Sequence, residues 1–269
     1  MKTREIKVKD NTRVVTHNEL VKAIGLEELS LHAAKLFYIA VSQCKKTDPE
    51  FYEYKISIPQ FANLMRVDPS NVYKTADSVT TELLRTLIIA KMPSIKKNSR
   101  SDMKFEKYSI FSKCKYDPDT GEIYFKINQD MTDFLLGLSG NFTKPLLQDF
   151  LQMKSVYSMR IWHLLQIYMK SQKPATEIEG KEKEYYISLE ELKEVTGTQE
   201  KYKQIGEFKK EVLDKALREI HKYAGVQMEY REKKLGKRIV GFYFKIVPLL
   251  ITPKLIAEKI DREFELKEI

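Results

Sequence analysis

One short pattern occurs twice in the chain, 131 residues apart, and this duplication constrains the fold more than any other feature. The pattern is Tyr-x-Ile-Ser-apolar-x-x-apolar-x-x-apolar, and it begins at Tyr54 and again at Tyr185. Each copy predicts a short strand, then Ser57 or Ser188 as a helix N-cap, then a short helix with apolar residues every third position. An offset of this size indicates two similar domains rather than a solenoid of small repeats.

A turn and a longer helix are predicted after each copy, at residues 68–84 and 208–223. In both, apolar residues recur every three or four positions, which is typical of a helix with one buried face. The expected buried residues are Val72, Ala76, Val79 and Leu83 in the first helix, and Phe208, Val212, Ala216, Leu217 and Ile220 in the second.

A β-hairpin is predicted after each long helix. The first hairpin has strands at residues 105–116 and 122–127, and the second has strands at 226–231 and 239–246 with a turn at 233–238. Helix, turn, helix and hairpin in this order indicate a winged helix-turn-helix. The predicted fold class is therefore α+β, with two tandem winged-helix domains as pseudo-repeats.

The expected domain limits follow from the repeat. We predict an N-terminal domain at residues 14–140, a C-terminal domain at 141–250 and a C-terminal tail at 251–269. One helix should precede each copy, at residues 30–43 and 144–169.

Composition narrows the class of protein. The 269 residues carry a formal net charge of +9, which suggests an anionic partner, most often nucleic acid. The chain has no apolar run long enough for a membrane span and no apolar core typical of a secretion signal at its start, so we expect a cytoplasmic protein with no membrane partner. Cys44 and Cys114 form neither a disulfide framework nor a zinc spacing.

Candidate binding residues surround the starts of the two long helices and the second hairpin turn. A helix-turn-helix presents the N-terminal part of its second helix to the major groove of double-stranded DNA, and a wing tip contacts the sugar–phosphate backbone. The candidate DNA-binding residues are Ser70, Asn71, Tyr73, Lys74, Lys201, Tyr202, Lys203, Lys209, Lys210, Lys215, Arg218, Lys233, Lys234, Lys237 and Arg238.

Catalytic chemistry is not predicted. A DNA-nicking enzyme would need a metal-binding His-apolar-His pair, and no two of His17, His32, His163 and His221 are two residues apart. No phosphate-binding P-loop occurs, and residues 117–121 indicate a turn rather than a calcium loop. We therefore expect a protein that is not an enzyme, with no catalytic residues, no metal and no cofactor, and with His163 packed in a core.

Several blocks resemble one known family. Residues 151–165 are similar to a Lys-Ser-x-Tyr-Ser-apolar-Arg signature, with Trp162 and His163 in place of the usual aliphatic–aromatic pair. Residues 15–23, 187–194 and 208–220 match further blocks. On these motifs the chain resembles the theta-type, iteron-binding replication initiators of bacterial plasmids, over most of its length.

The resemblance implies a function. Members of that family use two winged helices to bind direct repeats (iterons) at a plasmid origin and have no catalytic site. The N-terminal domain would contact DNA and form a homodimer that represses its own gene, and the C-terminal domain would be the main iteron-binding domain. The host initiator and the replicative helicase would be partners. Tyr157 and Arg160 match the signature, but we interpret them as structural.

Two alternatives remain open from the sequence. A winged-helix transcriptional repressor would bind DNA without starting replication. A protein-interaction module would use its winged helices to bind proteins, and its basic charge would serve solubility.

Overall fold

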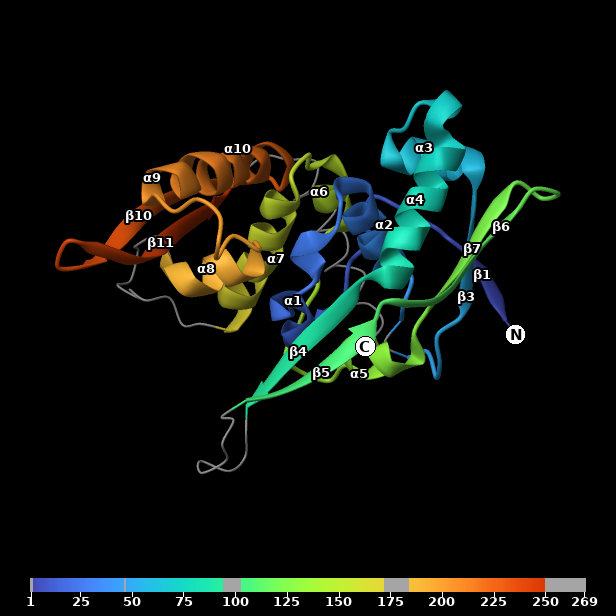
Figure 1. Ribbon diagram of the computed structural model, residues 1–269, viewed down its shortest axis with the longest axis horizontal. Coiled ribbons are helices and arrows are strands. Elements are labelled where there is room, and N and C mark those ends of the chain that lie inside the picture. Colours follow the sequence, from blue (N-terminus) through green and yellow to red (C-terminus); the bar gives the residue numbers. More distant parts are fainter. Residues whose placement is uncertain (1, 46, 94–102, 172–183, 250–269) are drawn as a thin grey trace, which may run out of the picture. The chain divides into compact units, whose positions relative to one another are not determined.

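The computed structural model describes residues 2–45, 47–93, 103–171 and 184–249, so the predicted tail at 251–269 lies outside the described residues. Two compact units make up the chain (Figure 1). Unit 1 comprises Met1–Val8 and Arg13–Leu151, and unit 2 comprises Lys9–Thr12 and the chain from Gln152 onward. Each unit combines helices with a β-sheet, which confirms the predicted α+β class.

Helices of unit 1 follow the predicted order. Helix α2 (Leu31–Ser42) begins after Ser30, whose hydroxyl accepts a hydrogen bond from the Ala33 amide at 3.3 Å. Strand β3 (Glu53–Ser57) leads into α3 (Ile58–Met65), and Ser57 caps α3 as predicted. A left-handed residue, Arg66, ends α3 before the 3-10 turn η2 (Pro69–Asn71) and the long helix α4 (Val72–Arg85).

The main sheet of unit 1 has the order β1-β3-β7-β6. Strand β1 (Thr3–Glu5) is parallel to β3, whereas β7 (Glu122–Ile127) is antiparallel to both β3 and β6 (Phe111–Asp117). Alternate residues of β7 are buried, because one sheet face packs on the helices.

The first predicted hairpin is wrong in its first strand. Residues 105–116 do not form one strand, because they divide into β5 (Met103–Ser109), which pairs with β4 (Leu87–Pro93), and β6, which pairs with β7. The break falls at Ile110 and Phe111, which are adjacent and both about 1% exposed. Two consecutive buried residues end the alternation of one strand, so the chain changes sheets there.

Several short elements complete unit 1, and its last residue lies later in the chain than predicted. They are β2 (Thr16–His17), α1 (Asn18–Lys22), η1 (Leu26–Glu28), η3 (Gln129–Met131), α5 (Thr132–Leu135), β8 (Phe142–Thr143) and α6 (Leu147–Gln152). Strand β8 pairs with β2, and the ring of Phe150 stacks on that of Tyr38 at 4.1 Å. These contacts keep the chain in unit 1 as far as Leu151, beyond the expected limit at residue 140.

Unit 2 repeats the arrangement more simply. It contains α7 (Val156–Ser171), β9 (Glu184–Ser188), α8 (Leu189–Val195), α9 (Ile205–Phe208), the π-helical turn η4 (Lys209–Leu213), α10 (Asp214–Tyr223), β10 (Val226–Leu235) and β11 (Arg238–Pro248). The sheet order is β10-β11-β9, all antiparallel. The single helix predicted at 144–169 is wrong, because α6 and α7 are separate helices on either side of residues 153–155.

Elements α9, η4 and α10 join without a break into the long helix of unit 2, which starts at Ile205 rather than at residue 208. Leu213 and four residues spaced by four, Phe208, Val212, Ala216 and Ile220, are fully buried. Positions four apart in an α-helix drift by about 40° around the axis, since a turn takes 3.6 residues. The wider π turn at the start of this series reduces that drift and keeps Phe208 on the buried face.

The same contact joins two helices in both units. In unit 1 the Glu82 carboxylate at the end of α4 accepts hydrogen bonds from the Ser30 amide at 2.5 Å and hydroxyl at 2.6 Å. In unit 2 the Glu219 carboxylate on α10 accepts from the amides of Lys154 and Ser155 at 3.1–3.2 Å. Each long helix is therefore fixed to the start of the helix that precedes its copy of the repeat.

Candidate nucleic-acid interface

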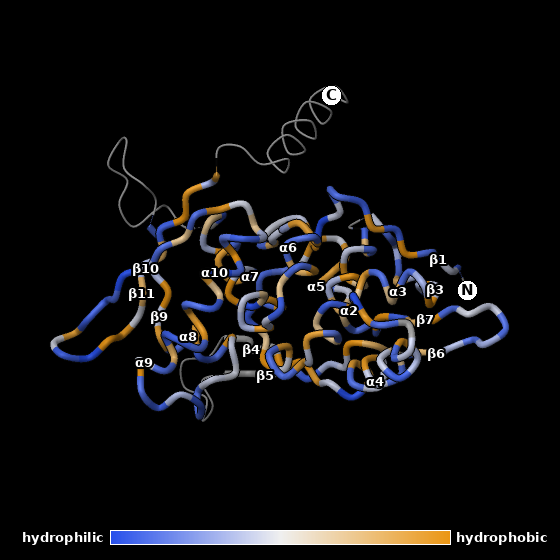
Figure 2. Tube along the Cα trace, turned by 90° about the horizontal axis from the view of Figure 1, so that it is seen from above, coloured by the Kyte–Doolittle hydropathy of each residue, from blue (hydrophilic) through white to orange (hydrophobic). Residues whose placement is uncertain are grey.

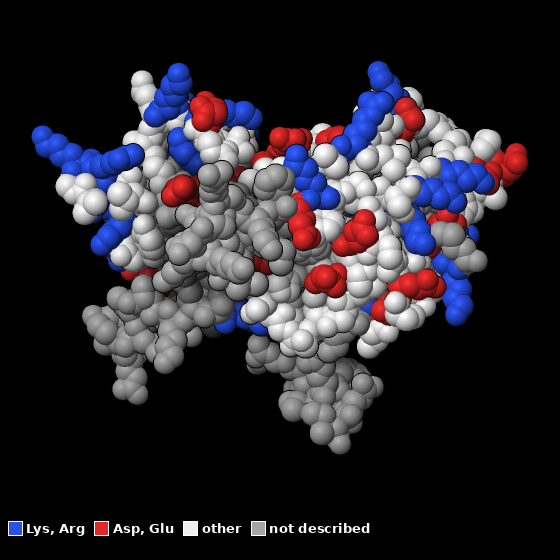
Figure 3. Space-filling model, turned by 60° about the horizontal axis from the view of Figure 1, so that its bottom comes forward, with Lys and Arg blue, Asp and Glu red and all other residues white. Residues whose placement is uncertain are grey.

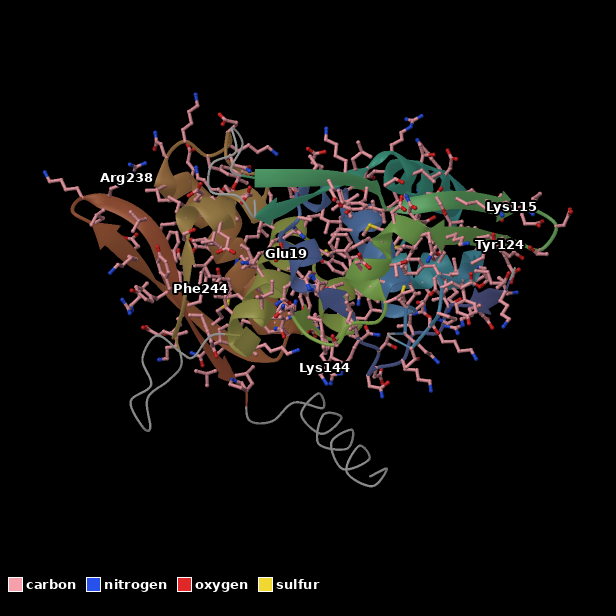
Figure 4. All side chains as sticks on the ribbon, turned by 90° about the horizontal axis from the view of Figure 1, so that it is seen from below. Glu19, Lys115, Tyr124, Lys144, Arg238 and Phe244 are labelled. Carbon is pink, nitrogen blue, oxygen red and sulfur yellow. The ribbon has the colours of Figure 1, made fainter. Side chains whose placement is uncertain are left out.

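The wing of unit 2 is the β10–β11 hairpin. Its strands pair as far as Leu235 opposite Arg238, which leaves Gly236 and Lys237 as a two-residue turn, with Gly236 at φ +61°. The turn is thus narrower than predicted, and Lys233 and Lys234 lie on strand β10. Figure 4 shows Arg238 near the outer end of this hairpin, with Phe244 on the part that meets the helices.

An ion pair and a hydrogen bond connect the wing to the long helix. The Glu232 carboxylate on β10 lies 2.8 Å from Lys209 Nζ on η4 and 3.0 Å from Lys234 Nζ. Both lysines lower the pKa of Glu232. In addition, the Tyr230 hydroxyl donates to Asp214 at 2.7 Å. Lys209 therefore holds the wing against the helix, which differs from the DNA contact predicted for it.

Most of the other predicted cations of unit 2 are exposed and uncompensated. Lys210 is 82% exposed, and only a distant contact of 3.9 Å joins it to Glu211. Figure 3 shows Lys and Arg side chains that project from the outline of the surface. Within the described part of the chain, the exposed cations of unit 2 without a side-chain ion pair include Lys201, Lys203, Lys215, Arg218, Lys233, Lys237 and Arg238.

The start of the long helix of unit 2 is open to an anion. Lys201 and Lys203 are exposed just before it, and its N-cap residue, Gln204, makes no side-chain capping bond in the described chain. The amides of a first helical turn attract phosphate when no side chain caps them. Tyr202 is half-buried with φ +50°, and its hydrogen bond with Tyr157 raises the pKa of Tyr202. It therefore shapes the turn before the helix.

In unit 1 the side chain of Asp68 already caps η2, the 3-10 turn that leads directly into α4. Asn71, Tyr73 and Lys74 are exposed as predicted. Ser70 is exposed too, but its hydroxyl donates to the Asp68 carboxylate at 2.5 Å and its amide donates at 2.9 Å. These bonds lower the pKa of Asp68, so a negative charge occupies this helix start. A contact from Ser70 to DNA would require breaking them.

The wing of unit 1, the β6–β7 hairpin, carries paired charges. Lys113 lies 2.8 Å from Glu53, and Lys115 lies 2.8 Å from Asp117. Its tip contains Asp117 and Asp119, and the Asp119 amide donates to the Asp117 carboxylate at 3.1 Å, which confirms a turn. Figure 4 shows Lys115 and Tyr124 on its two strands. A tip with two carboxylates is not suited to a phosphate backbone.

Four residues that are not among the candidate DNA contacts are structural: His163, Arg160, Cys44 and Cys114. His163 is 2% exposed, and burial lowers its pKa to about 3, with Arg160 adding to the effect. Arg160 is itself buried and donates to the Val195 carbonyl at 3.1 Å. Burial raises the thiol pKa of both Cys44 and Cys114 to about 12. These positions confirm the structural interpretation of His163 and Arg160.

Two further searches cover the described residues only. Among them, no group of three or more His, Cys, Asp or Glu side chains is placed to hold a metal ion. No described helix combines the length and apolar character that a membrane crossing requires.

The fold and the charges together define a tandem winged-helix protein whose second unit presents a basic helix and wing. The chain matches the family described as "Initiator Replication protein, WH1" over residues 13–166 and that described as "Initiator Rep protein, WH2" over residues 188–246. It therefore belongs to the plasmid-type initiator replication protein family, with one winged-helix domain of each kind.

A known protein and a solved structure are each similar to most of the chain. The PI protein of Escherichia coli is 25% identical over 272 residues, which cover 89% of this chain and 84% of that protein. A crystal structure described as the Pi initiator protein in complex with iteron DNA superposes with a TM-score of 0.69 at 23% identity. That alignment covers 90% of this chain and 99% of the other, so the two share a fold.

Proposed function

We propose that this chain initiates replication of a plasmid by binding the direct repeats of its origin as double-stranded DNA. The observation that carries the proposal is the set of uncompensated cations on the long helix and wing of unit 2. Membership of the initiator family supports it, and the similar Pi initiator protein has a structure with iteron DNA.

Unit 2 supplies the main contact in this proposal. The long helix enters the major groove, where base edges carry a distinguishable donor and acceptor pattern. Lys210, Lys215 and Arg218 face the base edges and adjoining phosphates. The wing lies along the sugar–phosphate backbone, with Lys233, Lys237 and Arg238 as phosphate contacts. Lys201 and Lys203 bind a phosphate beside the start of the helix.

Unit 1 has a lesser DNA contact and a second task. Asn71, Tyr73 and Lys74 touch an adjacent stretch of the repeat. As in the family that the sequence resembles, the N-terminal domain forms a homodimer that represses its own gene, and the host initiator and replicative helicase are partners. The protein acts in the bacterial cytoplasm, where plasmid DNA lies, without a catalytic step or cofactor of its own.

A replication assay tests the proposal. The gene and its upstream region, placed on DNA that lacks any other origin, should sustain an autonomous replicon. The upstream DNA should contain several direct repeats of about twenty base pairs, close to two helical turns, and the protein should protect them from nuclease. A transcriptional repressor would protect such sites but leave the replicon dead. Absence of salt-dependent binding to any duplex would favour a protein-interaction module instead.

A further inference from the structure

Leu235 is the most exposed large apolar side chain of the described residues, at 76%. It lies next to the two-residue turn of the unit 2 wing. A single exposed leucine is ordinary on a protein surface. This one is unusual because the four cations Lys233, Lys234, Lys237 and Arg238 surround it in sequence and all are exposed. Figure 2 shows the outer end of the hairpin as mainly hydrophilic.

The geometry of the wing leaves Leu235 uncovered. Side chains alternate between the two faces of a strand, so Leu235 lies on the face opposite Glu232 and Lys234. Glu232 turns toward the long helix, because it pairs with Lys209. The pairing shifts register between Lys233 and Lys234, with Val240 as the extra residue on β11. A bulge of this kind increases the local twist and re-aims the tip.

A partner for this tip must offer negative charge and an apolar surface together. The minor groove of DNA does so, since phosphates line both of its edges, sugars form its walls and base-pair edges form its floor. Apolar side chains inserted there part neighbouring base pairs and bend the duplex. The groove is about 6 Å wide, which suits a two-residue turn better than a helix. The Lys209–Glu232 and Tyr230–Asp214 bonds fix this tip relative to the helix assigned to the major groove.

We propose that Leu235 enters the minor groove beside the helix site and acts as an apolar wedge at a base-pair step, with Lys237 and Arg238 on the flanking phosphates. This inference rests on the proposed function and extends it. A wedge favours steps that unstack easily, such as T-A and C-A. The wing would thereby favour certain base-pair steps at a position where no side chain forms a hydrogen bond to a base.

Substitution of Leu235 tests the wedge in the full-length protein. The probe is a duplex that the wild-type protein selects from a random-sequence library. L235A should weaken binding about tenfold, which is the loss expected for one buried leucine side chain. The slope of log affinity against log salt should stay unchanged, because no phosphate contact is lost. The bend measured by gel phasing should decrease, and 2-aminopurine at the wedged step should lose its fluorescence increase on binding.

Three controls separate the wedge from other effects. L235M should keep affinity and bend, because methionine is of similar size and apolar. K237A should lower the salt slope by about one. L87A removes another exposed leucine, 51% exposed in unit 1, and should change nothing in DNA binding. Equal melting temperatures would show that the variants fold.

Distinct results would overturn the inference. If L235A binds and bends the selected duplex like the wild type, Leu235 is not a wedge. If L235A keeps DNA binding but loses binding to vesicles of phosphatidylglycerol and phosphatidylethanolamine, the tip is a membrane contact instead. If the wild type selects no duplex at all, the proposed function fails, irrespective of Leu235.

Discussion

The basic side chains of this chain fall into two groups, and the distinction depends on their neighbours. Lys113 and Lys115 on the unit 1 wing each lie 2.8 Å from a carboxylate, whereas Lys215, Arg218 and Lys237 of unit 2 have no ion pair within the described residues. An ion-paired lysine must break one charge contact to make another. We therefore expect the unpaired cations of unit 2 to be the better phosphate and base contacts.

Arg218 on α10 is exposed in the half of the long helix that follows the π turn. We expect R218A to cost about 1–3 kcal/mol of DNA-binding free energy and to relax the preference at one base pair. The measurement is a competition between the selected duplex and single-base variants of it. K113A, which removes a paired lysine in unit 1, serves as the control and should leave affinity and preference nearly unchanged. Equal losses for both variants would contradict the assignment.

His163 gives a prediction on pH. Its folded-state pKa is lowered to about 3, well below about 6.5 in the unfolded chain. Between these values the unfolded state binds a proton that the folded state does not, so stability is lost as pH falls. From pH 6 to 4 this residue should remove about 1.4 kcal/mol of unfolding free energy per pH unit. Urea titrations at several pH values should show a slope shallower by that amount in H163N, and an unchanged slope would refute the prediction.

The sequence largely predicted which candidate side chains are exposed, but not which of them form ion pairs or hydrogen bonds within the protein. The apolar spacing of the long helices correctly placed Lys210, Lys215 and Arg218 outside. The pairing of Lys209 with Glu232 depends on how the hairpin folds back on the helix, over 23 residues of chain. The one available signal was an acidic residue within the basic run of β10. Ser70 gave a clearer signal, because Asp68 two residues earlier is typical of a local turn.

Helices and strands were predicted best where the pattern is local. The Ser57 and Ser188 caps and the strand before each follow from a few adjacent residues, and the structure confirms them. The pairing of β4 with β5 was missed because a strand's partner is decided by distant packing. The break between α6 and α7 was missed because both helices are apolar, so one periodic pattern runs through both.

Gly25, the residue just before η1, lies close to the backbone of β4. It has φ +108°, and an added Cβ would lie 2.1 Å from the Leu87 carbonyl oxygen. Next to it, Ile24 and Ile89 form a β-bridge. G25A should therefore destabilise the chain by about 3 kcal/mol or more. The cost comes from backbone strain at a positive φ and from a clash with the Leu87 carbonyl, which cannot move aside as a flexible side chain could.

A matched glycine separates the two causes. Gly121 also has a positive φ, +63°, but an added Cβ would meet nothing within 4 Å. G121A should cost only about 1 kcal/mol, from the left-handed conformation alone. Chemical denaturation measures both. Equal costs would show that the close approach at Gly25 does not matter.

The two units share a topology but differ in electrostatics. Each has a long helix and a wing, and in each a carboxylate on the long helix accepts hydrogen bonds from the start of the preceding helix. Unit 1 has an acidic wing tip, and Asp68 caps the turn that leads into its long helix, whereas unit 2 has a basic tip and no side-chain cap at the start of its long helix. We therefore expect the two domains, which share one fold, to have different tasks. Sequence indicated the duplication, but the difference became visible only when each charge could be matched with its partner.

We propose that the uncompensated cations on one helix and one wing of unit 2 bind duplex DNA. The most direct test is the affinity for a selected duplex between 50 and 200 mM salt. If about six to ten phosphates are neutralised, affinity should fall roughly 10³–10⁵-fold over this range. A variant with Lys215, Arg218, Lys237 and Arg238 changed to alanine should bind more weakly, with the log–log slope reduced by up to about four. An unchanged slope in a folded variant would contradict the account.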